Sequence, residues 1–313
     1  MSASLARERA DLVDFALLGA TPVRLTASIE RFPLSEPFAI SRGAKTEAVV
    51  VVVRLETPDG RPAARGECVP YPRYDETAEA THAALVAAVP SDGWSDLRAL
   101  DALCCTLGPA SARNALDCAL WDLTARLSGC SVWRLLRRPP PGPVASFVTL
   151  SLDTPEAMAR AAQARVSTGV THLKLKLGGD GDAARMAAVR AVAHDAIMIG
   201  DANEAWSPDT LAILLDAAAS SGFALIEQPL PADADAALAT VTRAVPVCAD
   251  ESVHGADDVA RLADRYDAIN IKLDKAGGIT PALALADAAR AHGLSIMVGS
   301  MVSTSLSMAA AMT

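Results

Sequence analysis

The chain has 313 residues, of which 51% are hydrophobic, so it is long enough for one large barrel domain and a smaller companion domain. Its net charge is −9 and no basic stretch stands out, which argues against a nucleic-acid partner. No apolar run approaches the ~20 residues that cross a bilayer, so no membrane partner is expected.

Residues 1–21 are expected to form an N-terminal extension, in which Asp11 and Asp14 interrupt the apolar character. A secretory signal needs an unbroken apolar core of about 7–15 residues, so we expect a cytoplasmic protein. The six cysteines agree with this location because no C-x-x-C pair occurs among them. We therefore expect reduced, buried thiols and neither a disulfide framework nor a zinc site.

Residues 22–140 predict an α+β capping domain. Residues 22–57 alternate and are β-branched, and the turn PDGRPA and the segment ARGECVPY follow them, which is typical of a three-stranded antiparallel meander. Residues 76–136 have a helical pattern, in which Ser111 is the expected N-cap of one helix. One apolar face of that helix carries Ala112, Ala115, Ala119, Leu123 and Leu127. The proline-rich segment 137–144 is the expected domain boundary.

Residues 141–313 alternate short apolar runs with alanine-rich stretches of helix length. The predicted strands are ASFVTLSL, HLKLKL, AIMIGDAN, ALIEQPL, PVCADES, AINIKL and LSIMVGS. Seven strand–helix repeats favour a parallel (β/α)7β-type TIM barrel, with an open doubly wound sheet as the alternative. No G-x-G-x-x-G follows any strand, which argues against the dinucleotide-binding form of that alternative.

Charged and polar side chains follow five consecutive predicted strands at their C-terminal ends. They are Lys174, Lys176, Asp201, Asn203, Glu227, Asp250, Glu251 and Lys272. In a barrel these ends meet at one rim, where the active site forms. Solvated surface charges would scatter over both rims and the helices, so the pattern indicates a functional site.

Three successive strands contribute one carboxylate each: Asp201, Glu227 and Asp250. Three crowded carboxylates repel one another unless a cation lies among them, and hard oxygen ligands suit Mg²⁺. We expect these acids to hold Mg²⁺, with Asn203 and Glu251 beside them. The competing interpretation of each acid alone is a salt bridge to a barrel lysine.

Lys174 and Lys176 are two residues apart, so their side chains share the inward face of their strand. Lys272 lies four strands further round, close to diametrically opposite in an eight-stranded ring. A substrate between Lys176 and Lys272 would have a base on each face, as racemisation or epimerisation requires. Mg²⁺ with Lys174 beside it would stabilise the enediolate formed when a proton alpha to a carboxylate is removed. A cation nearby would also lower the pKa of a lysine toward the range that a general base needs.

The motifs THLKLKL, DANEAW, IEQPLPA, CADES and NIKLDKAGG, in this order, resemble the enolase superfamily and its muconate-lactonising subgroup. Within the subgroup, GECVPYPRYDET, ARNALDCALWDL and IEQPLPADADAAL are similar to the bacterial dipeptide (L-Ala-D/L-Glu) epimerases. The resemblance covers nearly all of residues 22–313. It implies an isomerase of cell-wall peptide metabolism with a small-molecule dipeptide substrate, and a homo-oligomer is a further possibility.

By this resemblance Asp201, Glu227 and Asp250 would bind Mg²⁺, and Lys176 and Lys272 would be the two bases. Lys174 would contact the substrate carboxylate. Arg42, in the loop after PFAIS, would bind the distal carboxylate of a glutamyl residue; its alternative is a solvated loop arginine. The family continues past this chain's final SMAAAMT with an eighth-strand region and an acidic D-x-D-type segment that binds the dipeptide's ammonium group. We therefore expect a C-terminally incomplete barrel.

Two alternatives to the epimerase interpretation remain at this point. An o-succinylbenzoate synthase or a muconate cycloisomerase would use this rim for β-elimination or cycloisomerisation. An inactive truncated fragment is the third interpretation.

Overall fold

The computed structural model describes residues 21–313, so the predicted extension lies outside the described residues except for its last residue. Its capping sheet has the order β3-β2-β1-β4. The strands are β1 (Pro22–Ile40), β2 (Gly43–Glu56), β3 (Ala63–Cys68) and β4 (Ser95–Asp96). Antiparallel pairing of β1 with β2 and of β2 with β3 confirms the predicted meander.

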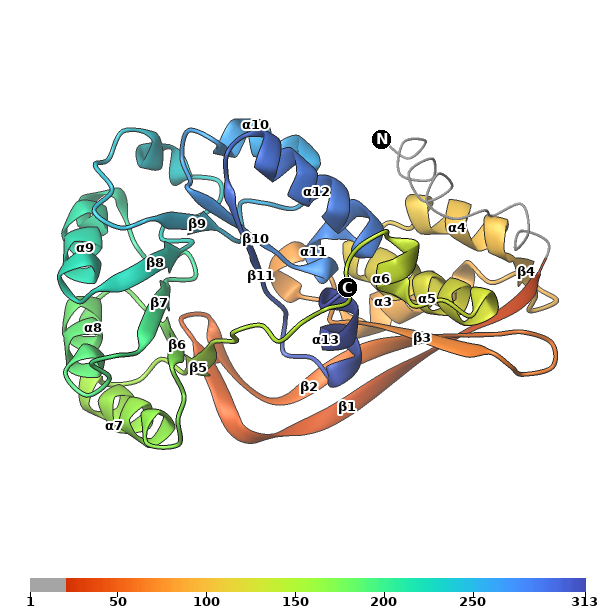
Figure 1. Ribbon diagram of the computed structural model, residues 1–313, viewed down its shortest axis with the longest axis horizontal. Helices are drawn as coiled ribbons and strands as arrows, with labels where there is room; N and C mark the ends of the chain where they lie inside the picture. The colour runs from red at the N-terminus through yellow and green to blue at the C-terminus, as the bar shows by residue number, and fades with distance from the viewer. Residues whose placement is uncertain (1–20) are drawn as a thin grey trace.

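The β1–β2 hairpin reaches from the capping domain to the barrel, where its tip lies beside β5 and β6 (Figure 1). A register shift between Pro33 and Phe38 separates the long paired region from the tip. The tip is joined to the barrel by a hydrogen bond from the Leu152 amide to the Ala39 carbonyl, 3.2 Å long. The fold thus brings residues near 40 to the C-terminal rim of the barrel.

Four helices complete the capping domain: α3 (Ala78–Ala87), α4 (Leu97–Thr106), α5 (Ala110–Ser128) and α6 (Val132–Leu135). The predicted face of α5 is confirmed: its alanines and Leu123 are fully buried, and Leu127 packs at the edge of the core. Helix α5 lies so close to β3 that a Cβ on Gly66 would be 2.0 Å from the Ala115 carbonyl oxygen. Only glycine fits this crossing.

The predicted N-cap of α5 was wrong. The helix begins at Ala110, with Pro109 in an extended conformation as the N-cap residue. Ser111 lies in the first turn, fully buried, with its Oγ 3.3 Å from Thr81 Oγ1 on α3. The serine therefore joins α5 to α3 of the capping domain and is the N-cap residue of neither helix.

Residues 138–147 contain neither helix nor strand and lead into seven parallel strands. In chain order they are β5 (Val148–Leu150), β6 (His172–Lys176), β7 (Ile197–Asp201), β8 (Phe223–Glu227), β9 (Val247–Ala249), β10 (Ala268–Ile271) and β11 (Ser295–Val298). Neighbours in sequence are neighbours in the sheet. Within the described residues β5 and β11 do not pair, so the sheet is a curled half-barrel. Helices cover its outer side (Figure 1), unlike the two-sided cover of a doubly wound sheet.

Full-length helices follow only some of these strands, so the prediction of seven regular repeats was partly wrong. They are α7 (Pro155–Val166), α8 (Asp182–Arg190), α9 (Pro208–Ser220) and α12 (Ile279–Ala291). The other connections hold short elements: η2 (Asp235–Ala239), η3 (Ala256–Asp258), α10 (Val259–Leu262) and α11 (Leu273–Ala276). Helix α13 (Ser305–Ala311) follows β11.

One apolar core runs through both the capping sheet and the barrel. A hydrogen bond from Trp121 Nε1 on α5 to Thr280 Oγ1 on α12, 2.9 Å long, also joins the two parts. Four cysteines, Cys68, Cys104, Cys118 and Cys248, are buried, and Cys105 and Cys130 are partly exposed. No helix in residues 21–313 is long and apolar enough to cross a membrane.

Candidate active site

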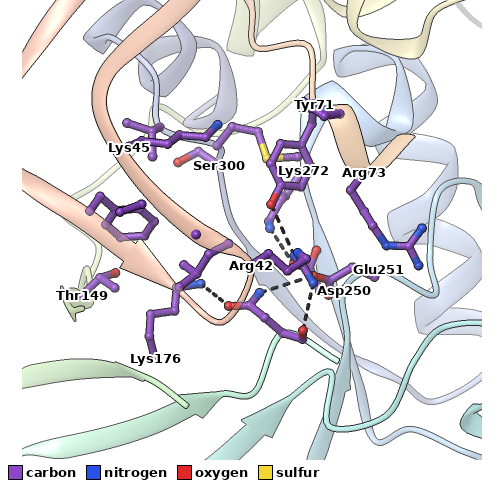
Figure 2. A pocket seen from close by; sticks show the side chains of 18 of the residues that line it. Arg42, Lys45, Tyr71, Arg73, Thr149, Lys176, Asp250, Glu251, Lys272 and Ser300 are labelled. Carbon is purple, nitrogen blue, oxygen red and sulfur yellow. Dashed lines mark hydrogen bonds and ion pairs between the residues drawn. The ribbon is translucent and has the colours of Figure 1, made fainter. Parts of the chain in front are cut away.

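A cavity of about 650 Å³ lies between the capping domain and the C-terminal ends of the barrel strands (Figure 2). The cap contributes Phe38, Ile40 and residues 42–45 from the hairpin tip, and residues 71–74 from the loop after β3. The barrel contributes residues from several strand ends and from the segment after β11. The cavity thus joins segments that are far apart in the sequence.

The parallel register aligns the predicted functional residues at one rim. Lys176 is paired with Asp201 between β6 and β7, and Asp201 with Glu227 between β7 and β8. Asp250 directly follows β9 and Lys272 directly follows β10. Lys174, Lys176, Asp250 and Lys272 line the cavity. The structure therefore brings together the residues that the strand-end pattern selected.

Ammonium groups lie between the three predicted metal-binding carboxylates. Lys174 Nζ is 2.9 Å from Asp201 Oδ2 and 2.5 Å from Glu227 Oε2. Lys176 Nζ is 2.6 Å from the same Asp201 oxygen, and Lys272 Nζ is 2.6 Å from Asp250 Oδ2. In residues 21–313 no three acidic, histidine or cysteine side chains surround a common point as metal ligands do. The salt bridges weighed as the alternative are therefore present in this structure.

The donor set nevertheless fits Mg²⁺. Asp201, Glu227 and Asp250 are at most 1% exposed and offer hard carboxylate oxygens from successive strands. Buried carboxylates need positive charge close by, which the lysines supply here and a divalent cation would supply equally. Asn270 Nδ2 donates to Glu227 Oε1 over 2.8 Å and fixes the orientation of that carboxylate.

Burial and neighbouring charge shift the pKa values of the lysines in different directions. Burial lowers the pKa of Lys176 despite the attraction of Asp201. Burial also acts to lower the pKa of Lys174, but the attraction of Asp201 and Glu227 is stronger and raises it. The pKa of Lys272 is raised against burial by Asp250, Glu227 and Glu251. Of these three lysines, Lys176 is therefore the one whose pKa is lowered, toward the range that suits a general base.

The acids have pKa values that follow the same balance. Burial acts to raise the pKa of Asp201, but Lys174 and Lys176 outweigh it and lower that pKa. The pKa of Asp250 is likewise lowered, against burial, by Lys272 and Lys275. Burial and the charge of Asp201 raise the pKa of Glu227. The rim is therefore a strongly coupled set of buried charges.

Arg42 reaches the cavity from the hairpin tip, but its guanidinium is already bound. It donates to Glu251 Oε1 over 2.6 Å, to the Asn203 carbonyl over 2.8 Å and to Glu204 Oε2 over 3.1 Å. Asn203 in turn accepts from Lys176 Nζ at Oδ1, 3.0 Å away, and donates from Nδ2 to Glu251 Oε1. Arg42, although partly exposed to solvent, is thus not free to bind an anion without leaving these partners.

Lys45 is a cation in the cavity that the sequence analysis did not select. No acidic side chain in residues 21–313 forms an ion pair with it, and its Nζ lies 5.0 Å from the centre of the Tyr71 ring. Burial lowers its pKa. A half-buried ammonium without a counter-charge is suited to binding an anionic group of a ligand.

Lys275 is a second residue that the sequence analysis missed. Its ammonium is buried behind Asp250 and lies 2.6 Å from Oδ1, whereas Lys272 binds Oδ2 of the same carboxylate. Lys275 does not line the cavity, since only 1% of its side chain is exposed. It therefore fixes Asp250 from behind, while Lys272 lines the cavity.

Gln228, the residue after Glu227, ties three strand ends together. Its Oε1 accepts from the amides of Asp250 and Ser252, at 2.8 and 3.1 Å. Its Nε2 donates to Tyr266 OH over 3.0 Å, and also to the Leu230 carbonyl and Ser252 Oγ. Gln228 adopts a left-handed φ of 37°, a strained conformation that such a network can hold.

Comparison with known proteins gives the family. Residues 23–137 match the mandelate racemase/muconate lactonizing enzyme N-terminal domain, and residues 157–313 match the enolase C-terminal domain-like family. The L-Ala-D/L-Glu epimerase of Escherichia coli is 44% identical over 283 residues, which are 90% of this chain and 87% of that protein.

Two solved structures share the fold. An enolase family member from Agrobacterium tumefaciens, with bound sodium and L-Ala-L-Glu, is 45% identical with a TM-score of 0.86, and the match covers 93% of this chain and 87% of that one. A dipeptide epimerase from Enterococcus faecalis, complexed with Mg and L-Leu-L-Tyr, is 29% identical with a TM-score of 0.85, covering 93% and 86%.

Proposed function

Because this chain belongs to the enolase superfamily, with the N-terminal and C-terminal domains of the mandelate racemase/muconate lactonizing enzymes, we propose that it is a dipeptide epimerase. The reaction inverts the carbon alpha to the carboxylate of an L-Ala-Glu-type dipeptide, and Mg²⁺ is the cofactor. The E. coli relative has the name of this activity, and the Agrobacterium structure contains L-Ala-L-Glu.

The observation that carries the proposal is a pair of lysines on well-separated strands of one cavity. Lys176 ends β6 and Lys272 follows β10, four strands away, and both line the cavity. Figure 2 shows the two side chains entering the cavity from different sides. A substrate between them has an amine near each face of its alpha carbon, which is what a two-base proton transfer needs.

The proton transfer uses these two side chains in turn. The neutral amine of one lysine takes the alpha proton, and the bonding electrons move into the carboxylate to form an enediolate. The ammonium of the other lysine then returns a proton to the opposite face, so the configuration inverts and no atom is gained or lost. The roles exchange for the reverse reaction.

Asp201, Glu227 and Asp250 are the residues that would hold Mg²⁺. The ion, when bound, supplies positive charge that stabilises the two enediolate oxygens. Lys174, whose ammonium lies beside Asp201 and Glu227, would bind the substrate carboxylate and add to this stabilisation. The buried carboxylates and the Mg in the Enterococcus structure both support this assignment.

Lys45 is the better candidate for the distal carboxylate of a glutamyl residue. Arg42 was expected in this role, but four acceptors already hold it, whereas no acid pairs with Lys45 in the described chain. We propose that Lys45 binds the distal carboxylate and that Arg42 fixes the hairpin tip to the barrel through Glu204 and Glu251.

The test is incubation of the full chain with L-Ala-L-Glu and Mg²⁺ in deuterated water, followed by proton NMR. We expect loss of the glutamyl alpha-proton signal as deuterium enters, together with appearance of L-Ala-D-Glu. An alkene product from o-succinylbenzoate synthase or cycloisomerase substrates, without alpha exchange of the dipeptide, would favour the elimination chemistry instead. A chain without a cooperative thermal transition in circular dichroism would contradict both enzymatic readings.

A further inference from the structure

One wall of the cavity is a short segment after β11 that lacks secondary structure of its own. Ser300, Met301 and Val302 line the cavity, and Figure 2 shows Ser300 on the same side as Lys45. Within residues 21–313, no backbone–backbone hydrogen bond involves residues 300–303. The position of this wall therefore depends on the anchors at its two ends.

The first anchor joins the wall to the barrel. The Gly299 amide donates to the Ile271 carbonyl over 2.9 Å, directly beyond the last residue of β11. The backbone at Gly299 lies so close to Asn270 that an added Cβ would be 2.5 Å from Asn270 Oδ1. This end of the wall is thus held against β10, and Lys272 is the residue directly after that strand.

The second anchor joins the wall to the capping domain through Glu67 on β3. Glu67 Oε1 accepts from the Thr304 amide over 2.8 Å, and Glu67 Oε2 accepts from the Thr304 hydroxyl. Thr304 is also the N-cap of α13, and its Oγ1 accepts from the Leu306 amide. One carboxylate thereby fixes both the end of the wall and the start of the next helix.

A small apolar cluster lies beside this anchor. Val50, Val52 and Val69 of the capping domain form a core separate from the main one, and Met301 and Leu306 pack against it. Apolar contacts have no preferred direction, so the cluster holds the wall near the capping domain without fixing the position of each wall residue. The two hydrogen bonds from Thr304 to Glu67 fix that position.

We infer that Glu67 is a positioning residue for substrate affinity: it places the wall Ser300–Val302 against the part of the substrate that extends from the alpha carbon toward the cap. Glu67 is 3% exposed and does not line the cavity, so its carboxylate reaches the wall through Thr304. The contacts described above for the rim lysines and acids do not involve Glu67, so we expect their geometry to remain when Glu67 is replaced. This inference rests on the proposed epimerase function.

The test compares Glu67→Ala with the wild type in two measurements. In hydrogen–deuterium exchange without substrate, we expect faster exchange in peptides covering residues 299–306. In epimerisation of L-Ala-L-Glu with Mg²⁺, we expect KM to rise about tenfold and kcat to change less than about twofold, as loss of a hydrogen bond to a charged group predicts. Glu67→Gln keeps a carbonyl oxygen for the Thr304 amide and should restore most of the wild-type KM.

Trp121→Phe is the matched control because it removes a cap–barrel hydrogen bond that does not touch the wall. It should lower the melting temperature and leave KM unchanged. Thr304→Val removes the hydroxyl contact to Glu67 and the N-cap of α13 but keeps the Thr304 amide donor, and it serves if Glu67→Ala does not fold. Unchanged exchange at residues 299–306, or a KM within twofold of the wild type in a folded variant, would overturn the inference. A wild type without alpha-proton exchange would instead contradict the proposed function.

Discussion

Asp274 offers a stability prediction whose size follows from the structure. This carboxylate lies on α11, where the barrel meets the cap, and is 5% exposed. Its Oδ1 accepts from the Val69 amide over 3.0 Å and from Asn114 Nδ2 over 2.8 Å. Burial raises the pKa of Asp274 from 3.8 to about 7 against these two hydrogen bonds, and the nearby acids Glu76 and Glu67 add to the rise.

The sign of the pH dependence follows from proton binding. Between about pH 4 and pH 7 the folded chain keeps the Asp274 proton that the unfolded chain has released, so stability falls as pH rises through this range. A shift of about three pKa units corresponds to about 4 kcal/mol at most. Asp274→Asn keeps the Oδ1 acceptor and cannot ionise, so it should lose this part of the pH dependence.

The assay is urea unfolding of the wild type and Asp274→Asn from pH 4 to pH 8.5. We expect the stability of the variant relative to the wild type to increase by up to about 4 kcal/mol across this range, with most of the change below pH 8. Asp216→Asn, on the exposed face of α9, is the control and should show a constant difference. A difference that is also constant for Asp274→Asn would refute the reasoning.

Three further outcomes are expected. Lys45→Met should raise KM for L-Ala-L-Glu at least about tenfold and leave KM for L-Ala-L-Ala nearly unchanged, since only the former has the distal carboxylate; equal effects on both dipeptides would count against its role. Chelation with EDTA should abolish epimerisation, and added Mg²⁺ should restore it. In calorimetry, Glu227→Gln should weaken Mg²⁺ binding about a hundredfold or more. Wild-type affinity in this variant would show that Glu227 is not a ligand of the ion. Gln228→Ala should lower the free energy of unfolding by about 3 kcal/mol because it leaves the buried Asp250 and Ser252 amides unpaired. A loss of less than about 0.5 kcal/mol would show that the network is dispensable for stability.

Much of the fold was predictable because its patterns are local. The alternation in residues 22–57 predicted the cap strands, and the alanine face of α5 is as buried as its spacing indicated. The rim was predictable for a similar reason. The C-terminal ends of parallel strands lie on one side of the sheet, so the polar residues that follow them come together however strongly the sheet is curved. Lys176, Asp201 and Glu227 therefore share one edge in register.

The parts that sequence reasoning missed depend on contacts between distant segments. Lys275 follows Lys272 by three residues and has the spacing of an ordinary helix lysine, and only the turn into α11 brings its ammonium to Asp250. Arg42 lines the cavity, but no local pattern indicates that Glu204 and Glu251 hold it. Ser111 is a residue type that N-cap positions favour, yet the helix begins one residue earlier, at Ala110, with Pro109 as the N-cap residue.

The central claim is that Lys176 and Lys272 act on opposite faces of one carbon. Lys176→Ala and Lys272→Ala, each incubated with L-Ala-L-Glu and with L-Ala-D-Glu in deuterated water, test it most directly by proton NMR. Each variant should fail to interconvert the isomers, and each should exchange the alpha proton of one isomer only, with the preference reversed between the two variants. Exchange of both isomers by either variant, or interconversion at the wild-type rate, would contradict the account.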